Sequence, residues 1–174
     1  MELLEYVDEN NEKIIGTAER DYIHKNNLWH REIAVWVMNE NNELLLQRRS
    51  SNKKQGANKF SIVAGHIGIN EKEISAAVRE VKEEIGLNAT ESDLNLIGIF
   101  KSEYENNNCF SYNYIIKTNR KIEDMTIQED EVSELKYISI EELEERINKQ
   151  DEEIGFRKKP HIKLVLEEIK RLKI

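Results

Sequence analysis

The sequence predicts one α/β domain, built in layers, over residues 1–174. Two observations support this class. A chain of 174 residues is long enough for one domain with a real core and short for two. Short apolar runs that are typical of strands are mixed with a few helical segments, and this mixture favours a layered α/β arrangement.

Short apolar runs bounded by polar turns predict the strands. Residues 2–8 and 13–19 lie on either side of a polar DENNE turn and predict an N-terminal β-hairpin. Further strands are expected at residues 32–39, 43–49, 60–64, 94–104, 109–118 and 132–139.

The clearest helix is predicted for residues 72–85. Its apolar residues recur at spacings of four, three and four and form one stripe, made by Ile74, Val78, Val81 and Ile85. Gly86 follows at the position where a left-handed C-cap glycine is expected. Residues 140–149 and 160–173 also predict helices, the second with Pro160 at its start, and residues 20–30 are expected to be irregular or weakly helical.

Composition excludes several kinds of partner. Lys and Arg number 26 against 34 Asp and Glu, a formal net charge of −8, so no basic stripe is available for nucleic acid or an acidic membrane. The lone Cys109 rules out an intrachain disulfide and indicates a reducing cytoplasm. We expect no signal peptide and no membrane span. A chain this acidic still binds anionic substrates when a divalent cation lies between them.

Residues 65–87 read GHIGINEKEISAAVREVKEEIGL and carry the clearest chemical signal. Glu80, Glu83 and Glu84 are spaced i, i+3 and i+4, so they share one helical face, which we expect to be distinct from the apolar stripe. Like charges at this spacing repel one another. The alternative is a solvated acidic face, and the surrounding glycines and the Arg-Glu pair favour a ligand site instead. Hard carboxylate oxygens suit Mg²⁺ or Mn²⁺.

The same segment matches a family signature at every defined position: Gly, five residues, Glu, seven residues, Arg-Glu, an apolar residue, any residue, Glu-Glu, any residue, Gly, apolar residue. It resembles the Nudix superfamily. The resemblance implies a Nudix-type α/β/α sandwich with a mixed central sheet, and Mg²⁺-dependent hydrolysis of a diphosphate linkage. By resemblance, Glu80, Glu83 and Glu84 hold the metal ions, the Gly65 carbonyl adds a ligand, and Glu71 and Arg79 form a structural ion pair.

A general base is also implied, because a metal-bound water must lose a proton to attack phosphorus. Glu84 or Glu83 could serve, but many family members use a later loop. The acidic stretch at residues 128–132 makes Glu131 the first candidate there, and a charged turn before a strand is an equally good interpretation of it.

Features outside the signature resemble one branch of the family, that of type I isopentenyl-diphosphate isomerase and its hydrolase relatives. They are LLLQRRSSNKKQG, the Gly-His pair at 65–66 and the N-terminal strand pair, over roughly residues 3–140. This resemblance implies that Arg49 and Lys53 grip the diphosphate, and that the histidines bind a further metal; these are His24, His30 and His66.

Isomerase chemistry is not expected. Ala64 stands where the isomerase has its cysteine, and residues 108–114 contain no glutamate, so the acid and base for alkene protonation are missing. The intact signature favours a hydrolase of a nucleoside diphosphate derivative or a related organic pyrophosphate, cytoplasmic and Mg²⁺-dependent, whose N-terminal hairpin could pair two copies. The alternatives are an isomerase-like enzyme and a non-catalytic nucleotide-sensing module.

Overall fold

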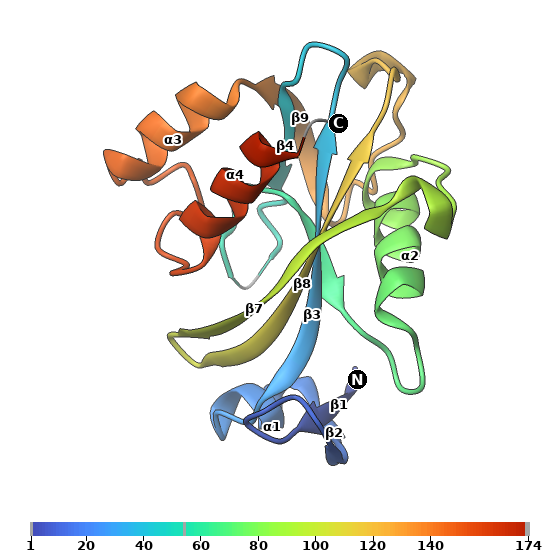
Figure 1. Cartoon of the computed structure of the whole chain (residues 1–174), viewed down its shortest axis with the longest axis vertical. Coiled ribbons are helices and arrows are strands. Elements are labelled where there is room, and N and C mark those ends of the chain that lie inside the picture. Colours follow the sequence, from blue (N-terminus) through green and yellow to red (C-terminus); the bar gives the residue numbers. More distant parts are fainter. Residues whose placement is uncertain (1, 54, 173–174) are drawn as a thin grey trace.

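A mixed β-sheet lies between helices on both of its faces (Figure 1). The computed structural model describes residues 2–53 and 55–172, and in that part of the chain nine strands form one sheet. Helix α2 covers one face, and α3 and α4 cover the other. The predicted α/β/α sandwich is confirmed. The prediction of a single domain over the whole chain stays a prediction.

Strand β3 is the centre of the sheet. It pairs with β8 in parallel and with β1, β4 and β6 antiparallel, which makes the sheet mixed. The remaining antiparallel pairs are β1 with β2, β4 with β5, β4 with β9, and β7 with β8. The strands are β1 (Leu3–Val7), β2 (Ile14–Glu19), β3 (His30–Met38), β4 (Leu44–Arg49), β5 (Phe60–Ser61), β6 (Val63–His66), β7 (Asn95–Tyr104), β8 (Asn107–Lys117) and β9 (Val132–Ile138).

The described helices are α1 (Arg20–Lys25), α2 (Glu73–Ile85), α3 (Ile140–Asn148) and α4 (Ile162–Arg171), with single 3₁₀ turns at η1 (Glu91–Asp93) and η2 (Ile122–Asp124). Gly86 ends α2 with φ of 66°, the left-handed conformation that the sequence predicted. Helix α4 begins two residues later than predicted, and residue 173 of that prediction lies outside the described residues. None of these helices is both long and apolar enough to cross a membrane.

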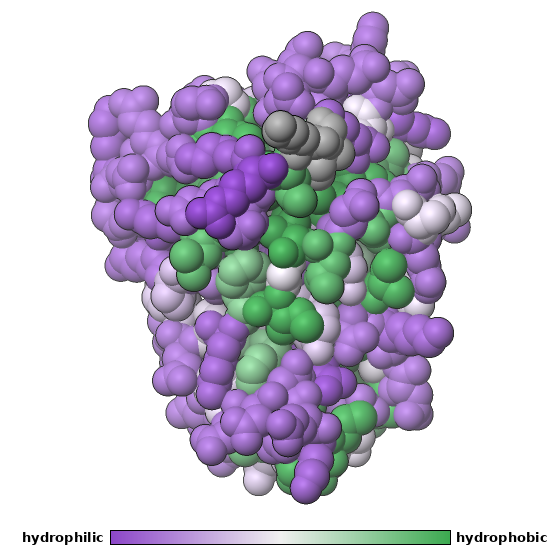
Figure 2. All heavy atoms as spheres, in the orientation of Figure 1, coloured by the Kyte–Doolittle hydropathy of each residue, from purple (hydrophilic) through white to green (hydrophobic). Residues whose placement is uncertain are grey.

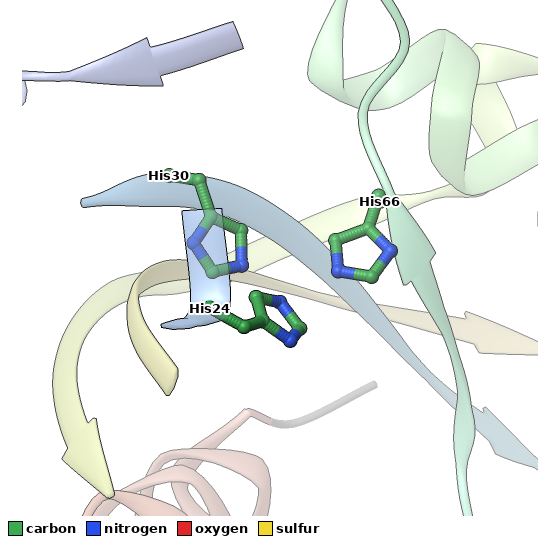
Figure 3. A group of neighbouring side chains, drawn as sticks. All are labelled: His24, His30 and His66. Atoms are coloured by element: carbon green, nitrogen blue, oxygen red, sulfur yellow. The ribbon is translucent and has the colours of Figure 1, made fainter. Parts of the chain in front are cut away.

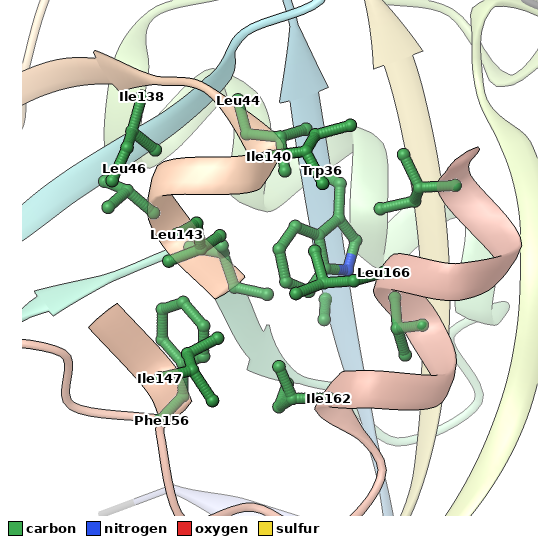
Figure 4. Packing of buried hydrophobic residues seen from close by; sticks show 14 of the residues in the cluster. Trp36, Leu44, Leu46, Ile138, Ile140, Leu143, Ile147, Phe156, Ile162 and Leu166 are labelled. Atoms are coloured by element: carbon green, nitrogen blue, oxygen red, sulfur yellow. The ribbon is translucent and has the colours of Figure 1, made fainter. Parts of the chain in front are cut away.

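Two hydrophobic clusters lie on opposite faces of the sheet. One joins Trp36, Leu44 and Leu46 to α3 and α4 (Figure 4), and the other joins Val35 and Val37 to α2. The apolar stripe predicted on α2 is confirmed: Val81 and Ile85 are buried in the second cluster, and Ile74 and Val78 are partly buried and pack against it. Ala76 and Ala77 of the same helix are fully buried as well.

Two predicted loops are shorter than expected. The strand predicted at residues 60–64 ends later than expected, because Gly65 and His66 pair with Ile33 and Glu32 of β3 and extend β6 to His66. The predicted strands 94–104 and 109–118 left residues 105–108 as the loop between them, but β8 already begins at Asn107, and β7 and β8 form a tight hairpin in which Tyr104 pairs with Asn107. Glu105 makes this turn possible by adopting a φ of 53°.

Figure 2 shows hydrophilic residues over α3 and around the N-terminal hairpin, with apolar residues reaching the surface between α4 and β7. The exposed side chains of these two elements include Leu96, Ile99 and Leu164, each about half exposed. Single exposed apolar residues of this kind are ordinary on protein surfaces.

Candidate active site

A cleft of about 780 Å³ lies beside the open ends of β3 and β8, and it gathers most of the predicted site residues. Its walls come from α2, the loop after β4 and the segment before α4. The predicted site residues that line it are His24, Arg49, Lys53, Gly65, His66, Arg79, Glu80, Glu83, Glu84 and Glu131.

The three glutamates of α2 are not equivalent. Glu84 is 5% exposed, whereas the Glu83 side chain is 52% exposed at the rim. Gln47 on β4 reaches Glu84, and its Nε2 donates a hydrogen bond of 2.6 Å to Glu84 Oε2. All three line the cleft and the apolar stripe packs in the second cluster, as the sequence predicted, although Glu84 is among the buried residues of α2.

Burial makes the carboxylates costly to ionise without a cation. It raises the pKa of Glu84 to about 8, against the opposing hydrogen bond from Gln47, and the nearby charges of Glu80 and Glu131 add to the rise. Burial also raises the pKa of Glu80, although the Arg79 guanidinium opposes this. Burial destabilises the charged form of these clustered carboxylates, and a bound divalent cation would stabilise it, since hard oxygen donors are the ligands that such cations prefer.

Strand β6 passes close to Glu80 at Gly65. A Cβ on Gly65 would lie 2.1 Å from Glu80 Oε1. The main chain of Gly65 and the Glu80 carboxylate therefore lie side by side, which fits the paired backbone and carboxylate ligands that the resemblance implied.

Arg79 ties the loop before α2 to the helix. Its Nε and Nη2 donate to the two oxygens of Glu71 at 2.9 and 3.0 Å, and Nη2 also donates to the His66 carbonyl at 3.1 Å. Glu71 in turn accepts from the Gly68 amide at 2.7 Å. These bonds lower the pKa of Glu71, with Arg79 as the main cause, so the pair stays charged and holds the loop in shape.

Glu131 and Lys53 form an ion pair across the mouth of the cleft. The backbone of their two loops is joined as well, since the Ser50 amide donates to the Glu131 carbonyl at 2.8 Å. Arg49 lies beside them, its Nε donating to the Gln55 carbonyl at 3.2 Å. The basic loop and the acidic stretch, far apart in sequence, therefore meet at one place.

The loop that carries Glu131 is also bound to the end of α2. The Thr126 amide donates to the Ile85 carbonyl at 3.2 Å, and the Gln128 amide donates to the Glu84 carbonyl at 3.3 Å. A Cβ on Gly86 would meet Thr126 atoms at 2.9 Å, so this contact admits no larger residue.

Three histidines from three elements face one another (Figure 3): His24 from α1, His30 from β3 and His66 from β6. One ring nitrogen of each lies within 4.8 Å of the others, a spacing that a shared metal ion could bridge. Nε2 of His24 and of His30 is buried without a hydrogen-bond partner among the described residues. Burial lowers the pKa of His30 to about 4, so its ring is neutral at pH 7, as a ligand must be.

Several cleft residues were not identified from sequence. Gln47, Asn113 and the pair of Glu32 with Lys159 all line or support the cleft. The sequence did offer a signal for Glu32, because this charged residue begins the apolar run EIAVWVMN, and a charge on a buried strand is rarely left without a partner. Lys159 lies in a charged segment that gave no signal.

The side chains of Trp36, Phe60 and Cys109 are structural. Trp36 is fully buried, and Phe60 is 3% exposed beneath the Arg48 guanidinium, which lies 4.1 Å from its ring centre. Cys109 is buried in β8. Tyr104, by contrast, lines the cleft.

A layered sheet with a glutamate-bearing helix at the edge of a cleft is the arrangement of hydrolases that act on phosphoric anhydrides. The family model described as the NUDIX domain matches residues 28–158, and the chain belongs to this family, whose members act on pyrophosphate bonds.

Relatives agree with this assignment. The chain is 37% identical over 150 residues to an uncharacterised Nudix hydrolase of Clostridium acetobutylicum, an alignment that covers 82% of this chain and 72% of that one. It is 28% identical over 149 residues to an isopentenyl-diphosphate Delta-isomerase of Photorhabdus laumondii, covering 84% and 82%. Relatives thus occur in both groups that the sequence resembled.

The fold has a close counterpart among solved structures. A crystal structure of a Deinococcus radiodurans protein superposes with a TM-score of 0.74 at 18% identity, and covers 99% of this chain and 100% of that one.

Proposed function

We propose that this protein hydrolyses the diphosphate linkage of a nucleoside diphosphate derivative or a related organic pyrophosphate, with Mg²⁺ as cofactor and Mn²⁺ as a substitute. The observation that carries the proposal is the buried carboxylate of Glu84, held by Gln47 in the cleft beside Glu80 and Gly65. A carboxylate so buried needs a cation to remain charged at neutral pH.

The proposed roles follow the geometry. Glu80, Glu83, Glu84 and the Gly65 carbonyl hold the metal, which supplies charge neutralisation and a more acidic water when bound. Arg49 and Lys53 contact the substrate phosphates. Glu131 is the first candidate for the general base, with Glu84 and Glu83 behind it, because its carboxylate lies in the cleft and close enough to raise the pKa of Glu84.

The histidines form a proposed second metal site. His24, His30 and His66 present their ring nitrogens within 4.8 Å of one another, and two of these nitrogens lack any partner in the described part of the chain. Co²⁺ titration followed by visible absorption tests this site. A band that appears in the wild type and is lost in His66→Ala supports it, and an unchanged spectrum in both contradicts it.

Hydrolysis is tested with a panel of nucleoside diphosphates, sugar nucleotides and dinucleoside polyphosphates in Mg²⁺, with products separated by ion-exchange chromatography. We expect turnover that EDTA abolishes and that Glu83→Gln or Glu84→Gln lowers by orders of magnitude. Wild-type turnover in both variants would contradict the metal assignment. Binding without turnover would instead favour a nucleotide-sensing module.

The cellular setting is also part of the proposal. A cytoplasmic location is supported by a single, buried, unpaired cysteine. Pairing of two copies through the N-terminal hairpin is supported by Ile14 and Ile15 of β2, which are 53% and 56% exposed. Light scattering of the wild type and of an Ile14→Lys, Ile15→Lys variant decides between a dimer and a monomer.

A further inference from the structure

One face of the central strands changes character along its length. On the face that carries α3 and α4, β3 presents Trp36 to the hydrophobic cluster, but at its other end it presents Glu32 to the cleft. Strand β8 follows the same pattern, with Ile115 in the cluster and Ser111 and Asn113 in the cleft. Since Glu32 pairs in register with Ser111, these polar residues lie side by side and form the cleft floor.

Glu32 is charged although it is nearly buried. Its side chain is 12% exposed, and Oε1 accepts from Lys159 Nζ at 3.1 Å. Its Oε2 accepts a long bond of 3.4 Å from Asn107 Nδ2, and the Cys109 thiol also bonds to this carboxylate. A carboxylate accepts about four hydrogen bonds, so Glu32 retains acceptor capacity toward the cleft. Asn107 Oδ1 is buried and also lacks a partner among the residues described.

The segment that carries Lys159 is fixed to the sheet. The Phe60 amide donates to the Glu153 carbonyl at 2.7 Å, and the Gly155 amide donates to the Phe60 carbonyl at 2.8 Å. Lys159 is 28% exposed and precedes Pro160, outside α4. The ion pair with Glu32 therefore joins two parts of the chain 127 residues apart at a defined position in the cleft.

The charged and polar groups of the cleft floor determine which organic group of a substrate can bind over them. A hydrocarbon chain laid over it would remove water from an ion pair and from unpaired acceptors without replacing the hydrogen bonds, which is strongly unfavourable. Adjacent hydroxyl groups would donate to Glu32 and Asn107 and accept from Lys159, and so satisfy every one of these atoms.

We propose that Glu32 and Lys159 bind the hydroxyl groups of a sugar in the substrate, and that the cleft thereby selects sugar-containing diphosphates over isoprenyl diphosphates. This inference rests on the proposed hydrolase function and adds to it a substrate class and the residues that select it.

The test compares ligands that differ in the proposed contact. The probes are ADP, CDP, GDP and UDP, their 2′,3′-dideoxy counterparts, and geranyl diphosphate, each with Mg²⁺. For the wild type we expect kcat/KM on the best ribonucleotide to exceed that on geranyl diphosphate by about a hundredfold, and that on its dideoxy form by about tenfold or more. This comparison needs no variant, so it stands even if a substitution prevents folding.

Variants then assign the effect to the pair. Glu32→Gln and Lys159→Met should each raise KM for the ribonucleotide about tenfold with little change in kcat, and leave KM for the dideoxy form nearly unchanged. Matched controls remove similar groups outside the cleft: Glu153→Gln breaks a pair with Arg146, and Lys170→Met breaks a pair with Glu144. Both controls should behave as the wild type.

Equal losses on the ribonucleotide and dideoxy forms would overturn the inference, because they would mark Glu32 as merely structural. Efficient hydrolysis of geranyl diphosphate would overturn it while leaving the hydrolase function intact. If the wild type cleaves neither these probes nor the sugar nucleotides and dinucleoside polyphosphates of the wider panel, the hydrolase function fails, and calorimetric binding decides the inference separately. Ribonucleotide binding that is weakened in Glu32→Gln supports the sugar site, and binding that is equal for ribonucleotide and dideoxy forms overturns it.

Discussion

Replacing Glu84 by glutamine should stabilise the metal-free protein at neutral pH while removing its stabilisation by Mg²⁺. The glutamine is neutral, and its carbonyl can still accept the bond from Gln47 Nε2. Its new amide group can donate to Gln47 Oε1, a buried atom that has no partner in the described residues. The variant therefore keeps the local packing and loses only the buried charge.

The magnitude follows from the raised pKa of Glu84, about 8 against its ordinary 4.5. Between these two values the folded protein holds a proton that the unfolded chain has released, so the free energy of unfolding falls as pH rises from about 4.5 to about 8. At about 1.4 kcal/mol per pH unit, the loss by pH 7 is at most about 3.5 kcal/mol. Glu84→Gln avoids this loss, whereas Mg²⁺ offsets it in the wild type only.

The measurement is urea unfolding of both proteins from pH 5 to 8.5, in EDTA and in Mg²⁺. The difference between variant and wild type isolates Glu84, because other titrating groups are common to both. In EDTA this difference should grow in favour of the variant as pH rises, and in Mg²⁺ it should shrink or reverse. A difference that is independent of pH, or equal stabilisation of both proteins by Mg²⁺, would refute the reasoning.

Three further predictions concern neighbouring positions. Gly65→Ala should weaken Mg²⁺ binding by about tenfold or more with a smaller effect on folding, since the new methyl group would displace only the flexible end of Glu80. Calorimetry measures the Mg²⁺ affinity, and thermal unfolding measures the stability. An unchanged Mg²⁺ affinity would count against the contact between Gly65 and Glu80. Arg79→Gln should lower the free energy of unfolding by about 1–3 kcal/mol, because it leaves Glu71 without its main partner. Glu71→Gln keeps a neutral hydrogen-bond partner for Arg79 and should lower the free energy of unfolding by less. A larger loss of stability in Glu71→Gln than in Arg79→Gln would contradict the argument. Ala64→Cys should produce no dimethylallyl diphosphate from isopentenyl diphosphate, because one added thiol does not supply the missing glutamate, and a chromatographic product peak would disprove this.

The sequence was informative where local rules decide the structure. Helix α2 and its left-handed end at Gly86 follow from periodicity and from the conformational freedom of glycine, so both were predicted. The strand order and the parallel pairing of β3 with β8 depend on contacts between distant segments and were not predicted; the family resemblance implied only a mixed central sheet.

The candidate site was predictable in part for the same reason. Spacing placed Glu80, Glu83 and Glu84 on one helix, but their unequal burial depends on how α2 packs beside β4, which no local pattern encodes. The pairing of Glu32 with Lys159 was invisible because neither residue has its partner within reach along the chain.

The hydrogen bonds between the end of α2 and residues 126–128 have a consequence for loop exchange between family members. Glu84 and Glu131 belong to one hydrogen-bonded unit, because the segment that leads to Glu131 is bonded to the carbonyls of Glu84 and Ile85 and is packed against Gly86. Grafting residues 126–131 alone into another family member would place Glu131 beside a helix terminus that does not form the hydrogen bonds this segment makes with the end of α2. Transplanting the two together keeps the junction intact, so the smallest exchangeable piece of this cleft extends from the helix terminus through the loop.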